Sequence, residues 1–129
     1  MTSTCHIIDN IECIFYTGNP DIPLNLSVRA EGNNVHVTWI SNFDGGLKQQ
    51  FVIEYSRDGE NQWHLVQVYK TSENKQHSRK IPGLTKMGLY IFRMYSLNKL
   101  GASSRTNESY VYIDGNVIRT QFIILTSKL

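Results

Sequence analysis

Three of the four histidines in this sequence are placed where acid–base or metal chemistry would first be sought. His36, His64 and His77 fall on different segments, far apart along the chain. No two of them have the i, i+4 spacing, and no Cys-x-x-Cys is present, by which short segments present ligands to a metal ion. We therefore expect histidines at the surface or at strand edges, with no metal and no cofactor.

The carboxylates and hydroxyls give no stronger indication of catalysis. Glu54 occupies an outward position of a predicted strand, and the sequence places no second carboxylate to act with it as an acid–base pair. No Gly-x-Ser-x-Gly surrounds a serine, and no Lys-Ser/Thr follows Gly45-Gly46 as it would in a phosphate-binding loop. The sequence therefore predicts a protein that is not an enzyme. The other candidates, which fall on turns or strands without catalytic context, are Asp44, Asp58, Glu60, Ser56, Ser96 and Ser103.

The composition fits one small β-rich domain. Of 129 residues, 40% are hydrophobic and 19% are charged, which excludes a disordered or collagen-like chain. Seven Tyr, five Phe and two Trp favour β structure. The formal net charge of +2 gives no strong field for nucleic acid or an anionic membrane, and no apolar run is long enough to span a bilayer.

The clearest pattern runs from Ile81 to Gly101. Pro82 and Gly83 break the chain, and from Tyr90 onward two sets of side chains alternate, with one set facing a core and the other facing out, as in a strand. The first set is Tyr90, Phe92, Met94 and Ser96, and the second is Ile91, Arg93, Tyr95 and Leu97. Leu84 before the turn and Tyr90 at the start of the strand predict a tyrosine corner, in which the hydroxyl donates to backbone ahead of the strand. An ordinary hairpin with an edge tyrosine is the alternative.

Other segments show the same alternation between turn residues, and none has useful helical periodicity. Seven strands are predicted, at residues 24–30, 35–40, 50–56, 63–69, 78–81, about 90–97 and about 103–113, the last with a break near Asn107. Seven short strands at close spacing predict an all-β sandwich. Its core is expected to contain Trp39, Tyr55, Leu84, Tyr90 and Phe92.

These segments together resemble a fibronectin type III domain over about Asn19 to Ile113. The resemblance rests on motifs in a shared order: Pro20-Asp-Ile-Pro23-x-x-Leu26, Val35-x-Val37-x-Trp39, Phe51-x-Ile53-x-Tyr55, Trp63, Gly83-Leu84, Tyr90-x-Phe92-Arg93 and Asn98-x-x-Gly101-x-Ser103. It implies a seven-stranded immunoglobulin-like β-sandwich with sheets A-B-E and C′-C-F-G. The segment from Asn42 to Tyr55 also resembles the matching loop and strand of nephrin-like adhesion receptors.

One position departs from the family pattern. Arg79 stands where family members often place an aromatic or aliphatic side chain, two residues before Ile81. Either the guanidinium extends outward over an apolar stem, or the strand that ends at Ile81 is shifted.

Two extensions flank the predicted domain, which spans residues 19–113. In residues 1–18, the run Thr4 to Asn10 resembles a late immunoglobulin strand, with Ile14 to Tyr16 as the last strand. This segment is either the remnant of a preceding immunoglobulin domain, with Cys5 lacking its partner, or a leader in which Cys5 and Cys13 are free thiols or a local disulfide. Residues 19–23, with two prolines, predict an interdomain hinge.

Residues 114–129 lie past the predicted sandwich. They are interpreted as a truncated or artificial end, poorly ordered, or else as an extra edge strand. The sequence shows neither a secretion signal nor a membrane span, so we expect the chain to be a fragment of a larger protein.

Two kinds of surface site are predicted. The outward positions Val52, Ile91, Arg93 and Tyr95 combine aliphatic, aromatic and Arg side chains, as the core of a protein interface does, although an ordinary sandwich exterior is the alternative. The tripeptides that begin at Asn25 and Asn107 have the Asn-x-Ser pattern of N-glycosylation, with chance occurrence as the alternative.

The resemblance implies a non-catalytic protein-binding and spacer module of a cell-surface adhesion receptor, mediating cell–cell contacts. Its partners would be other cell-surface proteins, in homophilic or heterophilic contact, with neither nucleic acid nor a small-molecule substrate. The module would lie on the extracellular side of the plasma membrane within a larger, membrane-anchored protein. The alternative is an intracellular structural module of a muscle-type scaffold protein. A cytokine-receptor module ranks lower because Trp-Ser-x-Trp-Ser is absent.

Overall fold

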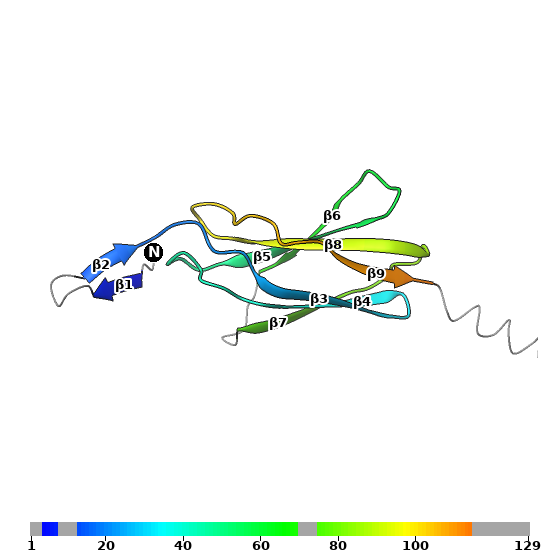
Figure 1. Cartoon of the computed structure of the whole chain (residues 1–129), viewed down its shortest axis with the longest axis horizontal. Helices are drawn as coiled ribbons and strands as arrows, with labels where there is room; N and C mark the ends of the chain where they lie inside the picture. Colours follow the sequence, from blue (N-terminus) through cyan, green and yellow to red (C-terminus); the bar gives the residue numbers. More distant parts are fainter. Residues whose placement is uncertain (1–3, 8–12, 70–74, 115–129) are drawn as a thin grey trace, which may run out of the picture.

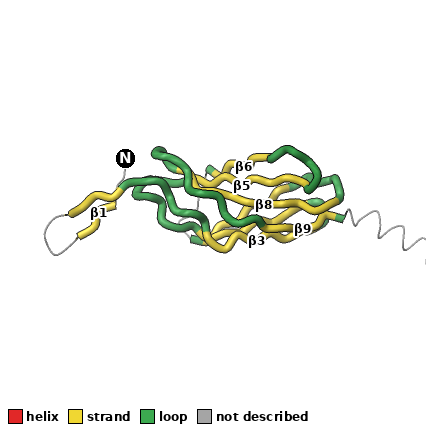
Figure 2. The backbone as a smooth tube through the Cα atoms, turned by 45° about the horizontal axis from the view of Figure 1, so that its top comes forward, coloured by secondary structure: helices red, strands yellow, loops and turns green. Residues whose placement is uncertain are grey.

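The chain folds into β-strands joined by turns and loops (Figures 1 and 2). This computed structural model describes residues 4–7, 13–69 and 75–114, and side chains from residue 17 onward. Within these ranges there are nine strands and no helix. The strands are β1 (Thr4–Ile7), β2 (Cys13–Tyr16), β3 (Leu24–Glu31), β4 (Asn34–Ile40), β5 (Gln50–Arg57), β6 (His64–Val68), β7 (Gln76–Ile81), β8 (Gly88–Leu97) and β9 (Ser109–Ile113).

Strands β3 to β9 form two packed sheets. One sheet has the order β3-β4-β7 and the other has the order β6-β5-β8-β9, with every neighbouring pair antiparallel. In Figure 1 the three-stranded sheet lies below the four-stranded one. The order matches the expected sheets A-B-E and C′-C-F-G, so the predicted all-β, seven-stranded, fibronectin type III-like sandwich is confirmed.

The core lies between the two sheets because each strand turns alternate side chains inward. On β4 the inward set is Val35, Val37 and Trp39, which are fully or almost fully buried. The Trp39 ring meets Phe51 of β5 edge to face, with ring centroids 5.5 Å apart. Burying one such large apolar side chain stabilises the fold by roughly 1.5–3 kcal/mol. The rest of the buried cluster is Ile53, Val68, Ile81, Leu84, Tyr90, Phe92, Met94 and Ile113.

Tyr55 takes a more peripheral place in this core than the sequence pattern suggests. It is partly buried and packs against the cluster. Its ring stacks on Phe92 at 5.4 Å and on His64 at 5.0 Å between centroids. Burial raises the pKa of its phenol.

The tyrosine corner is present where β8 begins. The Tyr90 hydroxyl donates a hydrogen bond of 2.7 Å to the backbone carbonyl of Lys86, ahead of the strand. Leu84, on the other side of the turn, is buried beneath it. The prediction of a corner is therefore confirmed, and the alternative of an edge tyrosine is excluded.

The last strand is shorter than the sequence predicts. The prediction ran from about residue 103 to 113, whereas β9 begins at Ser109. Between them the chain still follows β8, but hydroxyls replace ladder carbonyls: the Ser103 Oγ accepts from the Ser96 amide at 2.9 Å and the Thr106 Oγ1 accepts from the Met94 amide at 3.0 Å. Side-chain oxygens satisfy the amides of β8 here, so the backbone does not need to be extended.

Strand β7 resolves the question raised by Arg79. The register places Val35 opposite Ile81 and Val37 opposite Arg79, so the strand is not shifted. Arg79 is exposed although it falls at an inward position, which is the first of the two alternatives. The strand also begins at Gln76, two residues before the predicted start.

The segment before β3, which the sequence predicts as an interdomain hinge, is hydrogen-bonded to loops of the sandwich. The Gly18 amide donates to the Gly45 carbonyl at 2.8 Å, and the Asp21 amide donates to the Phe43 carbonyl at 2.8 Å. The Asn98 side-chain amide donates to the Gly18 carbonyl at 2.7 Å. A Cβ on Gly45 would lie 2.2 Å from the Gly18 oxygen, so the close approach requires glycine there.

Strands β1 and β2 form a separate antiparallel pair at the N-terminal end (Figure 1). The register places Thr4 opposite Tyr16 and Ile7 opposite Cys13. The side chains of Cys5 and Cys13 lie outside the described part of the structure, as do residues 115–129. The predictions about the thiols and about the C-terminal segment therefore concern atoms that the structure does not describe.

Candidate interaction face and the groove beside it

The outer face of the β6-β5-β8-β9 sheet gathers the residues that the sequence suggested as an interface. Neighbouring β5 and β8 place Val52 opposite Tyr95 and Glu54 opposite Arg93. Ile91 lies one pair further along the same face, opposite Ser56. Strand alternation thus brings two short outward runs, from different parts of the chain, onto one surface.

Glu54 is the centre of this face. Its Oε1 accepts from the Arg93 Nε at 3.0 Å and from the Arg105 Nε at 2.5 Å. The sequence placed Glu54 at an outward position, and it does lie on the outer face, yet it is only 4% exposed. A buried charge is tolerated where it is paired and hydrogen-bonded, and here two guanidinium groups cover one carboxylate. The hydrogen bond to Glu54 in turn raises the pKa of Arg105.

Two aromatic rings extend the pairing. The Arg93 guanidinium lies over the Trp63 ring, 3.7 Å from its centroid, and the Arg105 guanidinium lies 5.6 Å from the Tyr95 ring centroid. Such contacts contribute about 0.5–1 kcal/mol at exposed sites. The five side chains form a continuous stack, the Arg–aromatic ladder: Trp63, Arg93, Glu54, Arg105 and Tyr95.

Sequence reasoning found Arg93 and Tyr95 but missed the other members of the ladder. The predicted strands already implied that Glu54 could face Arg93 across the sheet, so this pair was within reach. Arg105 was not, because it comes from the irregular segment before β9, where no period predicts direction.

The surface open to a partner differs from the predicted set at one position. Val52 does point to the outer face, but it is only 3% exposed, because neighbouring side chains cover it. The accessible apolar surface is supplied instead by Leu65, which pairs with Glu54 across β6 and is 61% exposed, and by Tyr110, which pairs with Ile91 across β9. Ile91, Arg93 and Tyr95 are half-buried between them.

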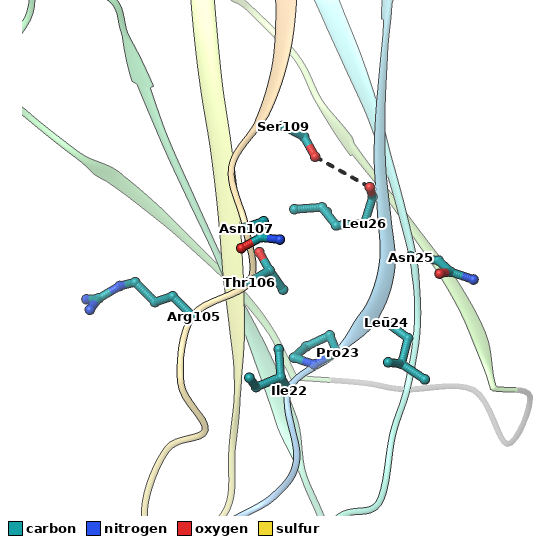
Figure 3. A pocket seen from close by; sticks show the side chains of 9 residues that line it. All are labelled: Ile22, Pro23, Leu24, Asn25, Leu26, Arg105, Thr106, Asn107 and Ser109. Carbon is teal, nitrogen blue, oxygen red and sulfur yellow. Dashed lines mark hydrogen bonds between the residues drawn. The ribbon is translucent and has the colours of Figure 1, made fainter.

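A groove of about 330 Å³ lies along the edge of the sandwich, between β3 and the segment before β9. Figure 3 shows Asn107 and Thr106 facing Leu26 and Ile22 across it, while Asn25 points away. The Ser109 hydroxyl donates to the Leu26 carbonyl at 3.4 Å and closes one end of the groove. Both asparagines of the Asn-x-Ser tripeptides therefore lie at one place in the fold, with different orientations.

Asn25 lies at an irregular point of β3. The register shifts between Leu24 and Ser27, and Asn25 has a φ of 54°. Asparagine is among the few residues other than glycine that adopt this left-handed conformation readily. The β3 ladder is therefore interrupted at Asn25.

The sequence predicts histidines at the surface or at strand edges, and His77 does lie on β7, at the edge of its sheet. His77 is not at the surface but is 8% exposed, packed against Trp39 and Phe51 with ring centroids 5.6 and 5.2 Å away. Burial lowers its pKa. His36 pairs with Glu31 at 2.8 Å and His64 stacks on Tyr55, so each histidine of the sandwich has a structural contact.

In the described ranges, no group of three or more His, Cys, Asp or Glu side chains is placed to hold a metal ion. In the same ranges there is no helix with the length and apolarity needed to cross a membrane. What the arrangement offers is a surface: an aromatic and basic sheet face with a shallow groove beside it.

The strand order, the tyrosine corner and the two packed sheets define the class of fold as a fibronectin type III-like sandwich. No family model matches the chain. Among curated proteins, it is 31% identical over 102 residues to the Xenopus laevis protein "Cell adhesion molecule-related/down-regulated by oncogenes". The match covers 75% of this chain and 8% of that protein, so the chain corresponds to a small part of its relative.

Solved structures agree on the fold. The FN1–FN3 domains of chicken CNTN1 superpose with a TM-score of 0.62 at 17% identity, covering 78% of this chain and 37% of that one. The titin kinase with its flanking domains gives a TM-score of 0.60 at 21% identity, covering 80% and 19%. The chain is thus similar to a fibronectin type III domain of the kind found in an adhesion molecule.

Proposed function

We propose that this chain is a non-catalytic protein-binding and spacer module of a cell-surface adhesion receptor and that it lies on the extracellular side of the membrane. The observation that carries the proposal is the sequence similarity to a cell adhesion molecule over three quarters of the chain. The likeness of residues 42–55 to nephrin-type proteins supports the same class. Residues 19–113 would form the folded module, and residues 1–18 the edge of a preceding unit.

The outer face of the β6-β5-β8-β9 sheet is the proposed contact surface. Aromatic and Arg side chains are enriched in interface cores, and this face carries Trp63, Arg93 and Tyr95 together with the exposed Leu65. The ladder holds the long Arg side chains in fixed positions, so less conformational entropy is lost when a partner binds. Its partners would be other cell-surface proteins or a second copy of this chain.

The proposal is tested by immobilising the full chain at high density on beads. Bead clustering and binding to a panel of cell-surface ectodomains are then measured. We expect either clustering or saturable binding to at least one ectodomain. A chain that remains monomeric and binds none of them would contradict the proposal. Recovery of partners only from cytosolic scaffold proteins would favour the intracellular alternative.

A further inference from the structure

The groove beside β3 combines two unlike walls. On one side lie Ile22, which is 39% exposed, and Leu26, with Pro23 between them. On the other lie the polar side chains of Thr106 and Asn107 (Figure 3). An exposed apolar shelf next to polar groups suits a ligand with one apolar face and polar edges, and the ring of a sugar has both.

The size of the groove agrees with a small occupant. Its volume of about 330 Å³ is at the lower end of the roughly 300–1,000 Å³ that small-molecule sites occupy. This is room for one or two sugar rings. The Asn107 side chain, at the start of an Asn-x-Ser tripeptide, already points into the space.

We propose that Asn107 carries an N-linked glycan whose first N-acetylglucosamine lies in this groove against Ile22 and Leu26. The inference rests on the proposed function, since the modification requires entry into the secretory pathway. In the transfer, the Asn107 amide nitrogen forms a bond to C1 of the sugar and loses a proton. The bond from C1 to the diphosphate of a lipid-linked sugar donor breaks, and the lipid diphosphate leaves with the bonding electron pair.

The sugar would add a contact between two segments that are far apart in the sequence. Ile22 belongs to the segment before β3, and Asn107 to the segment before β9, and the Ser109–Leu26 hydrogen bond is long at 3.4 Å. A ring seated between them would cover apolar surface on both and hold this edge closed. A glycan on Asn25 would have no such effect, because that side chain points away from the groove (Figure 3).

Occupancy is measured on the full chain, fused to a cleavable secretion signal and made in animal cells. Mass spectrometry of the peptide that contains Asn107 is applied to both medium and membrane fractions, so the result does not depend on export. We expect most signal-cleaved molecules to carry sugar on Asn107, and none in the Asn107→Gln variant. Signal-cleaved chains with an unmodified Asn107 would overturn the proposal.

Whether the sugar lies in the groove is measured separately. The chain carries Asn25→Gln, so that the compared forms differ only in the sugar on Asn107. The glycan is trimmed to a single N-acetylglucosamine, and the Tm is compared with that of the same chain made without sugar in bacteria. We expect the sugar to raise the Tm by roughly 4 °C, a shift that a small domain shows for modest stabilisation. The shift should vanish with Ile22→Ser and persist with Met87→Ser, a matched change at an exposed apolar residue away from the groove.

If Asn107 is glycosylated but the chains with and without the sugar have equal Tm values, the sugar does not lie in the groove and this part of the proposal is wrong. The binding panel separates this inference from the proposed function. If Asn107→Gln still binds ectodomains but wild-type Asn107 is bare, only the glycan proposal fails. If Asn107 is occupied and no ectodomain binds, the proposed function fails instead.

Discussion

At the scale of single residues, the Tyr90 hydroxyl shows how one atom fixes the crossing between the sheets. It is held 2.7 Å from the Lys86 carbonyl at the end of a buried ring, and burial raises the pKa of its phenol. Replacing Tyr90 with Phe keeps the ring and leaves that carbonyl without its donor. We expect a loss of about 1 kcal/mol, or a fall in Tm of roughly 4–8 °C.

The matched control for Tyr90→Phe is Tyr110→Phe, which removes a hydroxyl from an exposed ring on β9. Thermal unfolding of both variants followed by circular dichroism makes the comparison. Equal melting temperatures for the two would show that the corner bond contributes nothing.

The burial of His77 predicts that the stability of the fold depends on pH. Its pKa is lowered by burial against Trp39 and Phe51, so the unfolded chain takes up a proton near the ordinary pKa of 6.5 while the folded chain does not. The stability that its neutral form contributes is therefore complete above about pH 6.5. It is lost as the pH falls from there toward the lowered pKa of the folded state.

The His77→Phe variant tests this, because it keeps an aromatic ring and removes the titration. Urea unfolding is measured between about pH 7.5 and about pH 5.5 in both proteins, pH values chosen about a unit either side of the ordinary histidine pKa. We expect the variant to lose less stability on acidification than the wild type. Parallel stability curves for the two proteins would contradict the assignment.

At the scale of elements, the Arg–aromatic ladder joins β5, β8 and the segment before β9 through one carboxylate. Arg93→Gln should cost about 2 kcal/mol, because Arg93 is the more buried partner, and Arg105→Gln should cost less, because its side chain is 54% exposed. The double variant leaves Glu54 with neither partner. Its loss should exceed the sum of the single losses, which chemical denaturation will show. Additive losses would mean that the two pairs act independently.

The contact between the segment before β3 and the loop that contains Gly45 can be tested by substitution. Gly45 and Gly59 both have positive φ, but a Cβ on Gly45 would meet the Gly18 backbone, whereas one on Gly59 would meet nothing within 4 Å. Both Ala variants carry the left-handed conformational penalty of about 1–2 kcal/mol. Only Gly45→Ala should also accelerate hydrogen exchange at the Gly18 and Asp21 amides. Similar exchange at these amides in both variants would contradict the fixed junction.

At the scale of the whole molecule, the sandwich and its strand order could be predicted because period-two alternation in β3, β4 and β8 fixes which faces are buried. What could not be predicted depends on contacts across the chain. Glu54 and His77 are polar residues whose burial depends on Arg105 and on Trp39, which are distant in sequence. The two prolines before β3 indicate a stiff segment but not the partners that hold Gly18.

For the whole molecule, the central proposal is that the outer face of the β6-β5-β8-β9 sheet binds other proteins. The most direct test introduces one negative charge on each sheet, in separate variants, and compares how the two variants bind. Leu65→Glu changes the most exposed aliphatic residue of the proposed face, and Ser78→Glu adds the same charge to exposed β7 on the opposite sheet. Affinity for an ectodomain partner, or for a second copy of the chain, is measured with both variants after confirming equal folding. We expect Leu65→Glu to weaken binding about tenfold or more, as loss of a significant contact does, and Ser78→Glu to leave it unchanged. Binding that survives Leu65→Glu and falls with Ser78→Glu would place the interface on the other sheet.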